Sequence, residues 1–171
     1  MQVNMETDQD KTSRDTLDRV TEQIIGCAFT VINRLGSGFL EKVYENALAH
    51  ELRKAGLKVE QQYAVKVHYD GVVVGNYVAD LLVAGCVLVE LKAIKSLGNV
   101  ETAQCLNYLK ATGMRVCLLL NFARPRVQVK RIVHNFMCMM HKNLCLLSHA
   151  PNSARGLKGH LVKLLPTVMI T

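Results

Sequence analysis

The stretch Val78-Ala79-Asp80-Leu81-Leu82-Val83 is followed by Ala84-Gly85-Cys86 and then by Val87-Leu88-Val89-Glu90-Leu91-Lys92. Both apolar runs are rich in Val and Leu, and the short glycine-containing segment between them is typical of a tight turn. If Val83 and Val87 face each other across this turn, the same register places Asp80 opposite Glu90. Opposed residues on antiparallel strands lie on one face with Cβ atoms about 4.5–5.5 Å apart, and Lys92 shares that face.

Two facing carboxylates repel each other, and their neighbours here are Val, Leu and Ala. A hard divalent cation, Mg²⁺ or Mn²⁺, would relieve this repulsion, because such ions take carboxylate and carbonyl oxygens and leave positions for water and phosphate. Lys92 could then hold or activate an attacking water and stabilise charge on a phosphate. The alternative is a salt bridge of Lys92 with Glu90 or Asp80 at a solvated strand end, and spacing alone does not decide between the two.

The flanking sequence predicts alternating helices and strands. Apolar residues recur with helical spacing over 15–35 and again over 40–52, and the sequence 35–38 between them is rich in glycine. Asp70-Gly71 predicts a hairpin between strands at 65–69 and 72–83. A helix over 99–111 is expected between strands at 87–92 and 116–120, and an edge strand at 127–133 follows. This order predicts an α/β fold with a mixed central sheet.

Three polar residues outside the hairpin are further candidates for the site. Glu41 is at a helix start, where the helix dipole alone would favour an acid. Gln104 and Tyr108 are four residues apart and so share one face of a helix, where a plain surface hydrogen bond is the alternative interpretation.

The order of these motifs resembles the GxxExxY family of the PD-(D/E)XK nuclease superfamily over about residues 15–134. The matching positions are Gly38-x-x-Glu41-x-x-Tyr44, Asp80, Glu90-Leu91-Lys92, Gln104-x-x-x-Tyr108 and Leu119-Leu120-Asn121-Phe122. The resemblance implies a restriction-endonuclease-like core, with a mixed four-stranded sheet flanked by helices, and Mg²⁺-dependent (or Mn²⁺-dependent) hydrolysis of phosphodiester bonds.

The resemblance also implies a role for each matching residue. Asp80, Glu90 and the Leu91 carbonyl would be metal ligands. Glu41, Asp80, Glu90, Lys92 and Gln104 would be the catalytic set, with Tyr44 and Tyr108 in support. The implied substrate is nucleic acid, with DNA expected.

Length and composition fit one globular domain. The chain has 171 residues, of which 50% are hydrophobic. We expect a flexible N-terminus at 1–14, the nuclease-like domain at 15–134 and a basic extension of uncertain order at 135–171.

No apolar run is long enough for a membrane span, and the polar start lacks a secretory signal. We therefore expect a cytoplasmic protein with no membrane partner and with reduced cysteines. A homodimer is compatible with the sequence, which does not decide the oligomeric state.

The positive charge is concentrated in the last third of the chain, where residues 124–171 hold eight Lys and Arg and no acid, against a net charge of +7 overall. Arg124, Arg126, Lys130 and Arg131 are therefore candidates for contact with a nucleic-acid backbone. The extension could add to this grip, but a lineage-specific extension or an accident of gene boundary is the favoured interpretation. Within it, Cys138, His141, Cys145 and His149 have a spacing that could hold zinc but matches no familiar zinc module.

Three functional hypotheses remain open at this stage. The first is a metal-dependent nuclease. The second is an inactive nucleic-acid-binding or protein-interaction module that keeps the fold. The third is a hydrolase whose substrate is not ordinary DNA, because one fold can host several chemistries. The presence of all the charged positions and of Gln104 favours a working site over a decayed one.

Overall fold

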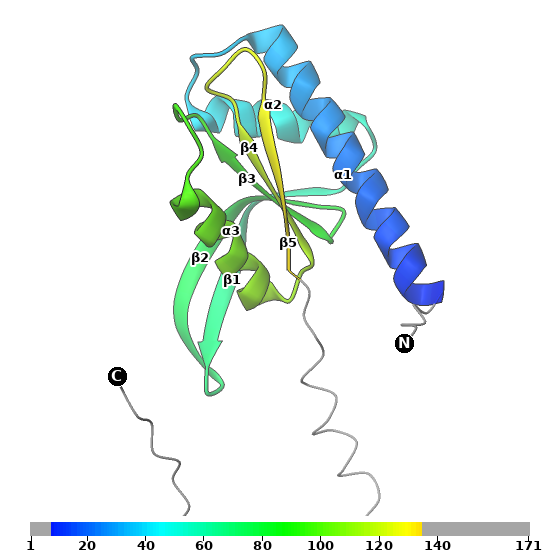
Figure 1. The fold of residues 1–171 in the computed structure, drawn as a ribbon, viewed down its shortest axis with the longest axis vertical. Coiled ribbons are helices and arrows are strands. Elements are labelled where there is room, and N and C mark those ends of the chain that lie inside the picture. Colours follow the sequence, from blue (N-terminus) through cyan, green and yellow to red (C-terminus); the bar gives the residue numbers. More distant parts are fainter. Residues whose placement is uncertain (1–7, 135–171) are drawn as a thin grey trace, which may run out of the picture. The chain divides into compact units, whose positions relative to one another are not determined.

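The computed structural model describes residues 8–134 (Figure 1). The predicted extension at 135–171 and the Cys138, His141, Cys145 and His149 spacing lie outside the described residues. The elements are α1 (Asp8–Leu35), α2 (Glu41–Lys54), β1 (Val59–Tyr69), β2 (Val72–Val83), β3 (Val87–Lys92), α3 (Asn99–Thr112), β4 (Val116–Asn121) and β5 (Gln128–Val133).

The strands form a single mixed sheet in the order β1-β2-β3-β4-β5. β3 and β4 are parallel, and the other neighbouring pairs are antiparallel. The predicted α/β class is confirmed, but the sheet has five strands where the resemblance implied four. The fifth strand, Gln128–Val133, is the edge strand that the sequence pattern predicts at 127–133, and it pairs with β4 along its whole length.

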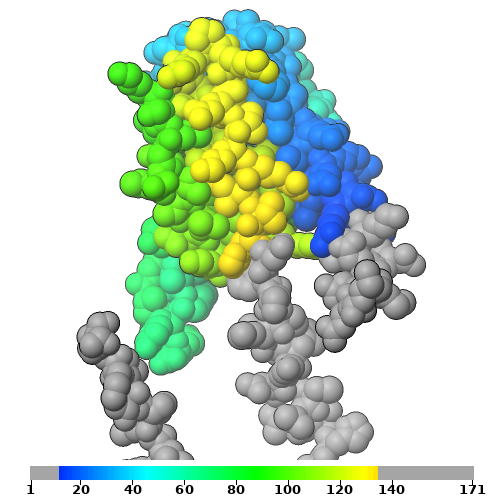
Figure 2. Space-filling model, viewed as in Figure 1, coloured from blue at the N-terminus to red at the C-terminus, as the bar shows by residue number. Residues whose placement is uncertain are grey.

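Helices cover both faces of the sheet, and each face has its own core (Figure 1). On one face, which we call the α1–α2 core, the buried residues include Ile24, Leu48, Leu81, Val89 and Leu118. On the other, the α3 core, they include Ala79, Leu82, Leu88, Cys105 and Leu119. Val116–Leu120 of β4 is buried throughout because both faces are covered, which is the pattern that its continuous apolar run predicts. Figure 2 shows β5 at the surface between α1 and α3.

Two elements begin earlier than the sequence pattern predicts. α1 starts at Asp8 rather than at Asp15, so residues 8–14 are helical where a flexible segment was expected. This segment contains neither Gly nor Pro, so nothing stops the helix that the apolar stripe establishes further along the chain. β1 starts at Val59 rather than at Val65, because its polar first half pairs with the buried end of β2.

The cysteines in the described part of the chain are free, as predicted. Cys105 and Cys117 are buried, and Cys27 and Cys86 are half-buried. Within residues 8–134, no helix combines the length and the apolar character that crossing a membrane requires.

Candidate active site

The site forms where the ladder between β2 and β3 ends. The pairs Val83↔Val87 and Leu81↔Val89 confirm the predicted register as far as Leu81, but the expected pair of Asp80 with Glu90 is not formed. No β2–β3 pair follows Leu81↔Val89, and the next contact is a hydrogen bond of 2.7 Å from the Leu91 amide to Asp80 Oδ2. The Asp80 carboxylate thus accepts the hydrogen bond that a backbone carbonyl of β2 would accept in a continued ladder.

Glu90 is the centre of a buried hydrogen-bond network. It is 2% exposed, and its Oε1 accepts hydrogen bonds from Lys92 Nζ at 2.5 Å and from Gln104 Nε2 at 2.8 Å. Gln104 Nε2 also lies 2.6 Å from the Tyr108 hydroxyl, which donates to the Val78 carbonyl at 2.9 Å. The other oxygen of Glu90, Oε2, is buried and has no hydrogen-bond partner among residues 8–134. A buried oxygen of this kind is one that a bound ion or water can satisfy.

The carboxylates of the site hold protons more tightly than exposed acids do. Burial, followed by the charge of Asp80, raises the pKa of Glu90 from 4.5 to about 7, although Lys92 opposes the shift. Burial also raises the pKa of Asp80, against the effects of the Leu91 amide and Lys92. Burial alone would lower the pKa of Lys92, but its hydrogen bond to Glu90 and the charges of the three nearby acids raise it instead.

Glu41 belongs to the same electrostatic cluster, as the sequence predicts. It is the first residue of α2. Burial raises its pKa and the charge of Asp80 adds to this, whereas Lys92 and the backbone N–H of Ala93 lower it. The structure therefore brings Glu41 together with Asp80, Glu90 and Lys92 from α2, β2 and β3.

Tyr44 lies behind the site and holds the loop that leads to Glu41. Its hydroxyl donates to the Gly36 carbonyl at 2.9 Å and accepts from the Phe39 amide at 3.2 Å. Its ring stacks on Phe122, with 4.7 Å between the ring centroids. Tyr44 thus fixes the start of α2, whereas Tyr108 contacts the site itself through Gln104.

A second buried acid, Glu45, was missed as a candidate in the sequence. It is 2% exposed, and it accepts hydrogen bonds from Lys42 Nζ at 2.7 Å, Gln61 Nε2 at 3.1 Å and Gln62 Nε2 at 2.9 Å. Its charge reaches both Asp80 and Glu41. The available signal was its position in the helical row of Glu41 and Leu48, which indicates the face of α2 that turns inward.

The sequence matches the PD-(D/E)XK nuclease superfamily over residues 18–132. The chain belongs to this superfamily. A search of curated proteins finds no match. Among solved structures, the chain is similar to the crystal structure of an alkaline exonuclease, LHK-Exo from Laribacter hongkongensis, with 13% identity, a TM-score of 0.37, and coverage of 69% of this chain and 82% of the other. The complex of LHK-Exo with dAMP gives 13% identity, a TM-score of 0.35, and coverage of 67% and 83%.

PD-(D/E)XK nucleases generally use divalent metal ions, and the oxygen groups of this site suit a hard cation. A cation would give Glu90 Oε2 a partner and would reduce the repulsion between Asp80 and Glu90. Within residues 8–134, no group of three or more His, Cys, Asp or Glu side chains is arranged to hold a metal. Two carboxylates would therefore need the Leu91 carbonyl and water to complete the shell, which suits Mg²⁺ because it usually keeps several waters.

Asn121 secures the chain directly after Lys92. β3 and β4 are parallel, and Lys92 pairs with Asn121 at their shared carboxyl end. The Asn121 side chain accepts from the amides of Ile94 at 3.1 Å and Ala123 at 3.2 Å, and donates to the Ile94 carbonyl at 2.7 Å. The loops that follow these two strands of the nuclease fold are therefore held together.

The four basic residues proposed for backbone contact do not form one patch. Arg124 and Arg126 lie in the loop after β4, at the end of the sheet where Lys92 lies, and line a hollow of about 520 Å³ that also includes Lys95, Ser96, Pro125, Val127 and Gln128. Arg124 Nη2 is 3.5 Å from the Lys95 carbonyl. Lys130 donates to Thr102 on α3 at 2.9 Å, and Arg131 pairs with Asp18 of α1 at 2.6 Å.

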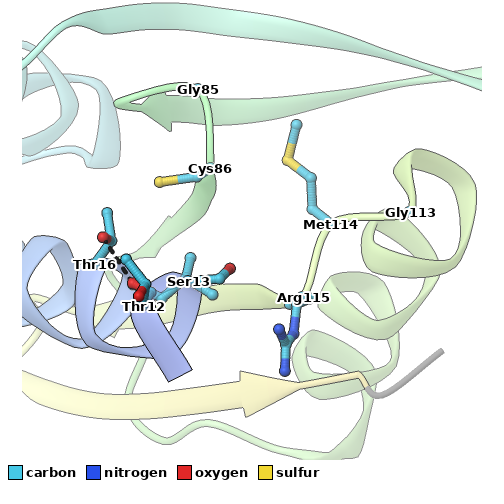
Figure 3. Close-up of a pocket in the computed structure, with 9 residues that line it drawn as sticks. Thr12, Ser13, Thr16, Gly85, Cys86, Gly113, Met114 and Arg115 are labelled. Atoms are coloured by element: carbon cyan, nitrogen blue, oxygen red, sulfur yellow. Dashed lines mark hydrogen bonds between the residues drawn. The ribbon is translucent and has the colours of Figure 1, made fainter. Parts of the chain in front are cut away.

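A second hollow of about 520 Å³ lies away from these acids. Its walls are the first turns of α1 (Thr12, Ser13, Thr16, Leu17), the β2–β3 turn (Gly85, Cys86) and the segment that leads into β4 (Gly113, Met114, Arg115). Figure 3 shows Cys86 and Met114 on opposite walls, and the hydrogen bond from the Thr16 hydroxyl to the Thr12 carbonyl. This hollow is at the amino end of β3, whereas Lys92 is at its carboxyl end, so it is not part of the carboxylate site.

Proposed function

We propose that this protein is a divalent-metal-dependent nuclease of the GxxExxY branch, which hydrolyses phosphodiester bonds of DNA at a site built from Glu41, Asp80, Glu90, Lys92 and Gln104. The observation that carries the proposal is the Asp80 and Glu90 pair, two mutually repelling acids of which one has a buried, partnerless oxygen. These groups lie at matching motif positions in a chain of the PD-(D/E)XK superfamily.

In this proposal Asp80, Glu90 and the Leu91 carbonyl hold the metal, either Mg²⁺ or Mn²⁺. When bound, the metal supplies a Lewis acid for the phosphate and a more acidic bound water. Glu41 projects from α2 toward the same carboxylates and would hold a metal-bound or attacking water in place. Gln104 orients the Glu90 carboxylate through its 2.8 Å hydrogen bond, and Tyr108 fixes Gln104 in turn.

We assign Lys92 an electrostatic role rather than that of a proton acceptor. Its pKa is raised because the charges of Glu90, Glu41 and Asp80 outweigh the effect of burial. A lysine that stays protonated at neutral pH cannot take a proton from water, but it can stabilise negative charge that develops on a phosphate. This assignment keeps one of the two roles expected of Lys92 from the sequence, the stabilisation of charge on a phosphate.

Nucleic-acid backbone contacts are assigned first to Arg124 and Arg126. Both line the hollow at the Lys92 end of the sheet, together with Lys95, and none of its lining residues in the described part of the chain is acidic. Lys130 and Arg131 are secondary candidates, because each already has a partner on α3 or α1. Such contacts bind phosphate and do not select a sequence.

The decisive experiment compares cleavage of plasmid DNA, single-stranded DNA and RNA in Mg²⁺, Mn²⁺ and chelator. We expect metal-dependent cleavage of DNA, reduced about 100-fold or more in Asp80→Ala and in Lys92→Ala, because each change removes a group from the reacting centre. The matched control is Asp70→Asn, which alters an exposed carboxylate in the turn between β1 and β2.

The outcomes separate the hypotheses. Cleavage that persists in both site variants would mean that the activity comes from elsewhere. Nucleic-acid binding without cleavage in either metal would support the inactive binding module. Cleavage of RNA alone would keep the reaction but correct the substrate.

A further inference from the structure

The alternation of side chains between the two faces of the sheet is interrupted at one point in the β1–β2 hairpin, and that point is Asp80. In β2, Leu81 and Val83 pack in the α1–α2 core, yet Ala79 packs in the α3 core. Residues two apart in a regular strand lie on the same face. The alternation is therefore broken between Ala79 and Leu81, which leaves Asp80 at the break.

The same break occurs in β1, directly across the ladder. Val59 packs against the α1–α2 core, whereas Tyr63 and Val65 belong to the α3 core. The register pairs Gln61 with Leu81 and Tyr63 with Ala79, but no pair joins Gln62 to Asp80. Both strands therefore change face at the position shared by these two residues.

Gln62 carries the unusual backbone conformation that accounts for this break. Its φ is +53°, in the left-handed region that side chains other than Gly, Asn and Asp seldom adopt. A residue held in such a conformation needs support from its surroundings. The support here is the hydrogen bond of 2.9 Å from Gln62 Nε2 to Glu45 Oε2, whose carboxylate is itself 3% exposed and held by Lys42.

We propose that Gln62, held in its left-handed conformation by Glu45, is the positioning residue of Asp80. Its kink releases Asp80 from the β1–β2 ladder, so that the strand turns here and the carboxylate reaches the Leu91 amide. The effect of Gln62 on catalysis rests on the proposed nuclease function, whereas its effect on the position of Asp80 does not.

The geometric test measures hydrogen exchange at the Leu91 amide by NMR, in the full-length chain without metal. Gln62→Val disfavours positive φ because Val is β-branched, whereas Gln62→Gly permits it freely. We expect Leu91 to exchange about tenfold faster in Gln62→Val and at close to the wild-type rate in Gln62→Gly. Gln61→Val is the matched control, because Gln61 also donates to Glu45 but precedes the kink.

Protection of Leu118, in the central strand β4, reports whether each variant remains folded. If Gln62→Val unfolds the protein, Gln62→Ala carries the test, since Ala also disfavours positive φ without adding bulk. Unchanged exchange at Leu91 in the folded variant overturns the proposal. Equal acceleration in Gln61→Val also overturns it, because the effect would then be a general loosening of β1.

Activity provides the second measurement. In Gln62→Val we expect kcat to fall about tenfold or more with little change in KM for DNA, because a displaced Asp80 disturbs the reaction geometry and leaves the contacts to the DNA backbone intact. In Gln62→Gly we expect most of the wild-type kcat to be kept. A rise in KM with an unchanged kcat contradicts the proposed role. If the wild-type protein cleaves nothing, the nuclease proposal fails, and the Leu91 measurement still decides the positioning of Asp80.

Discussion

The Glu90 carboxylate and the Lys92 ammonium group form a buried ion pair, with 2.5 Å between Oε1 and Nζ. Their side chains are only 3% and 17% exposed. The pair leaves Glu90 Oε2 without a partner, and Asp80 adds a second negative charge nearby. The Lys92 ammonium group therefore offsets the charge of more than one acid, so the metal-free site is sensitive to pH and to added metal.

The first prediction concerns the stability of the metal-free protein. The pKa of Glu90 is raised from 4.5 to about 7, so the folded state binds more protons than the unfolded state between these values. The free energy of unfolding therefore falls as the pH rises through this range. Glu90→Gln removes the effect and should be more stable than wild type by about 1–3 kcal/mol at pH 8, with no such gain at pH 4.

Urea denaturation in chelator at the two pH values measures this difference. Glu60→Gln, on an exposed part of β1, is the control and should change little. A Glu90→Gln variant that is less stable than wild type at pH 8 would contradict the prediction.

The second prediction concerns the coupling of proton and metal. Because Glu90 must lose its proton to bind a cation, the affinity for Mn²⁺ should rise by about tenfold or more between pH 6 and pH 8. Binding of Mn²⁺ near pH 6 should release a proton from Glu90 to the solution. Titration calorimetry in two buffers of different ionisation enthalpy measures both quantities. Glu90→Gln should bind Mn²⁺ weakly at every pH, and affinity that does not depend on pH in the wild type would count against Glu90 as a ligand.

The third prediction concerns Lys92. Its charge and hydrogen bond both lower the pKa of Glu90. In Lys92→Met the Glu90 pKa should therefore rise above its value of about 7 in the wild-type protein. Carbon-13 NMR of the Glu90 carboxyl group follows this titration directly, and a value that stays put or falls would show that the two groups are not coupled in solution.

The fourth prediction concerns the loop before α2. Tyr44→Phe removes the hydroxyl that bonds to Gly36 and Phe39, and should destabilise the protein by about 1–2 kcal/mol, because two backbone groups lose their partner. It should also lower activity, since the loop leads directly to Glu41. Tyr69→Phe, at an exposed position beside the hairpin turn, is the control for thermal unfolding and cleavage, and should match wild type.

The sequence predicts some parts of this site well because their physics is local. The turn at Gly85 and the apolar residues on either side are enough to fix the register from Val83↔Val87 to Leu81↔Val89, and so the neighbourhood of Asp80 and Glu90. The helical spacing of Gln104 and Tyr108 likewise predicts that they share a face, and the structure turns that face toward Glu90.

Other parts depend on contacts between distant segments, which spacing does not reveal. Gln62 precedes the strand predicted at 65–69, and its positive φ follows from its place in the folded structure beside Glu45 and Asp80. Arg131 belongs to a basic run in the sequence, but pairs with Asp18 from the first helix. The edge strand predicted at 127–133, by contrast, is present as Gln128–Val133 and pairs with β4.

The fifth prediction uses this division among the basic residues. Arg124 and Arg126 line the hollow at the Lys92 end of the sheet, so replacing both with Ala should weaken DNA binding and reduce the salt dependence of log K by about two ion contacts. Arg131→Ala should leave the slope nearly unchanged, since Asp18 already neutralises that guanidinium. Binding isotherms at several salt concentrations, in Ca²⁺ to suppress cleavage, measure the slopes. If Arg131→Ala lowers the slope as much as either loop arginine does, the nucleic acid runs along β5 rather than over the loop that follows β4.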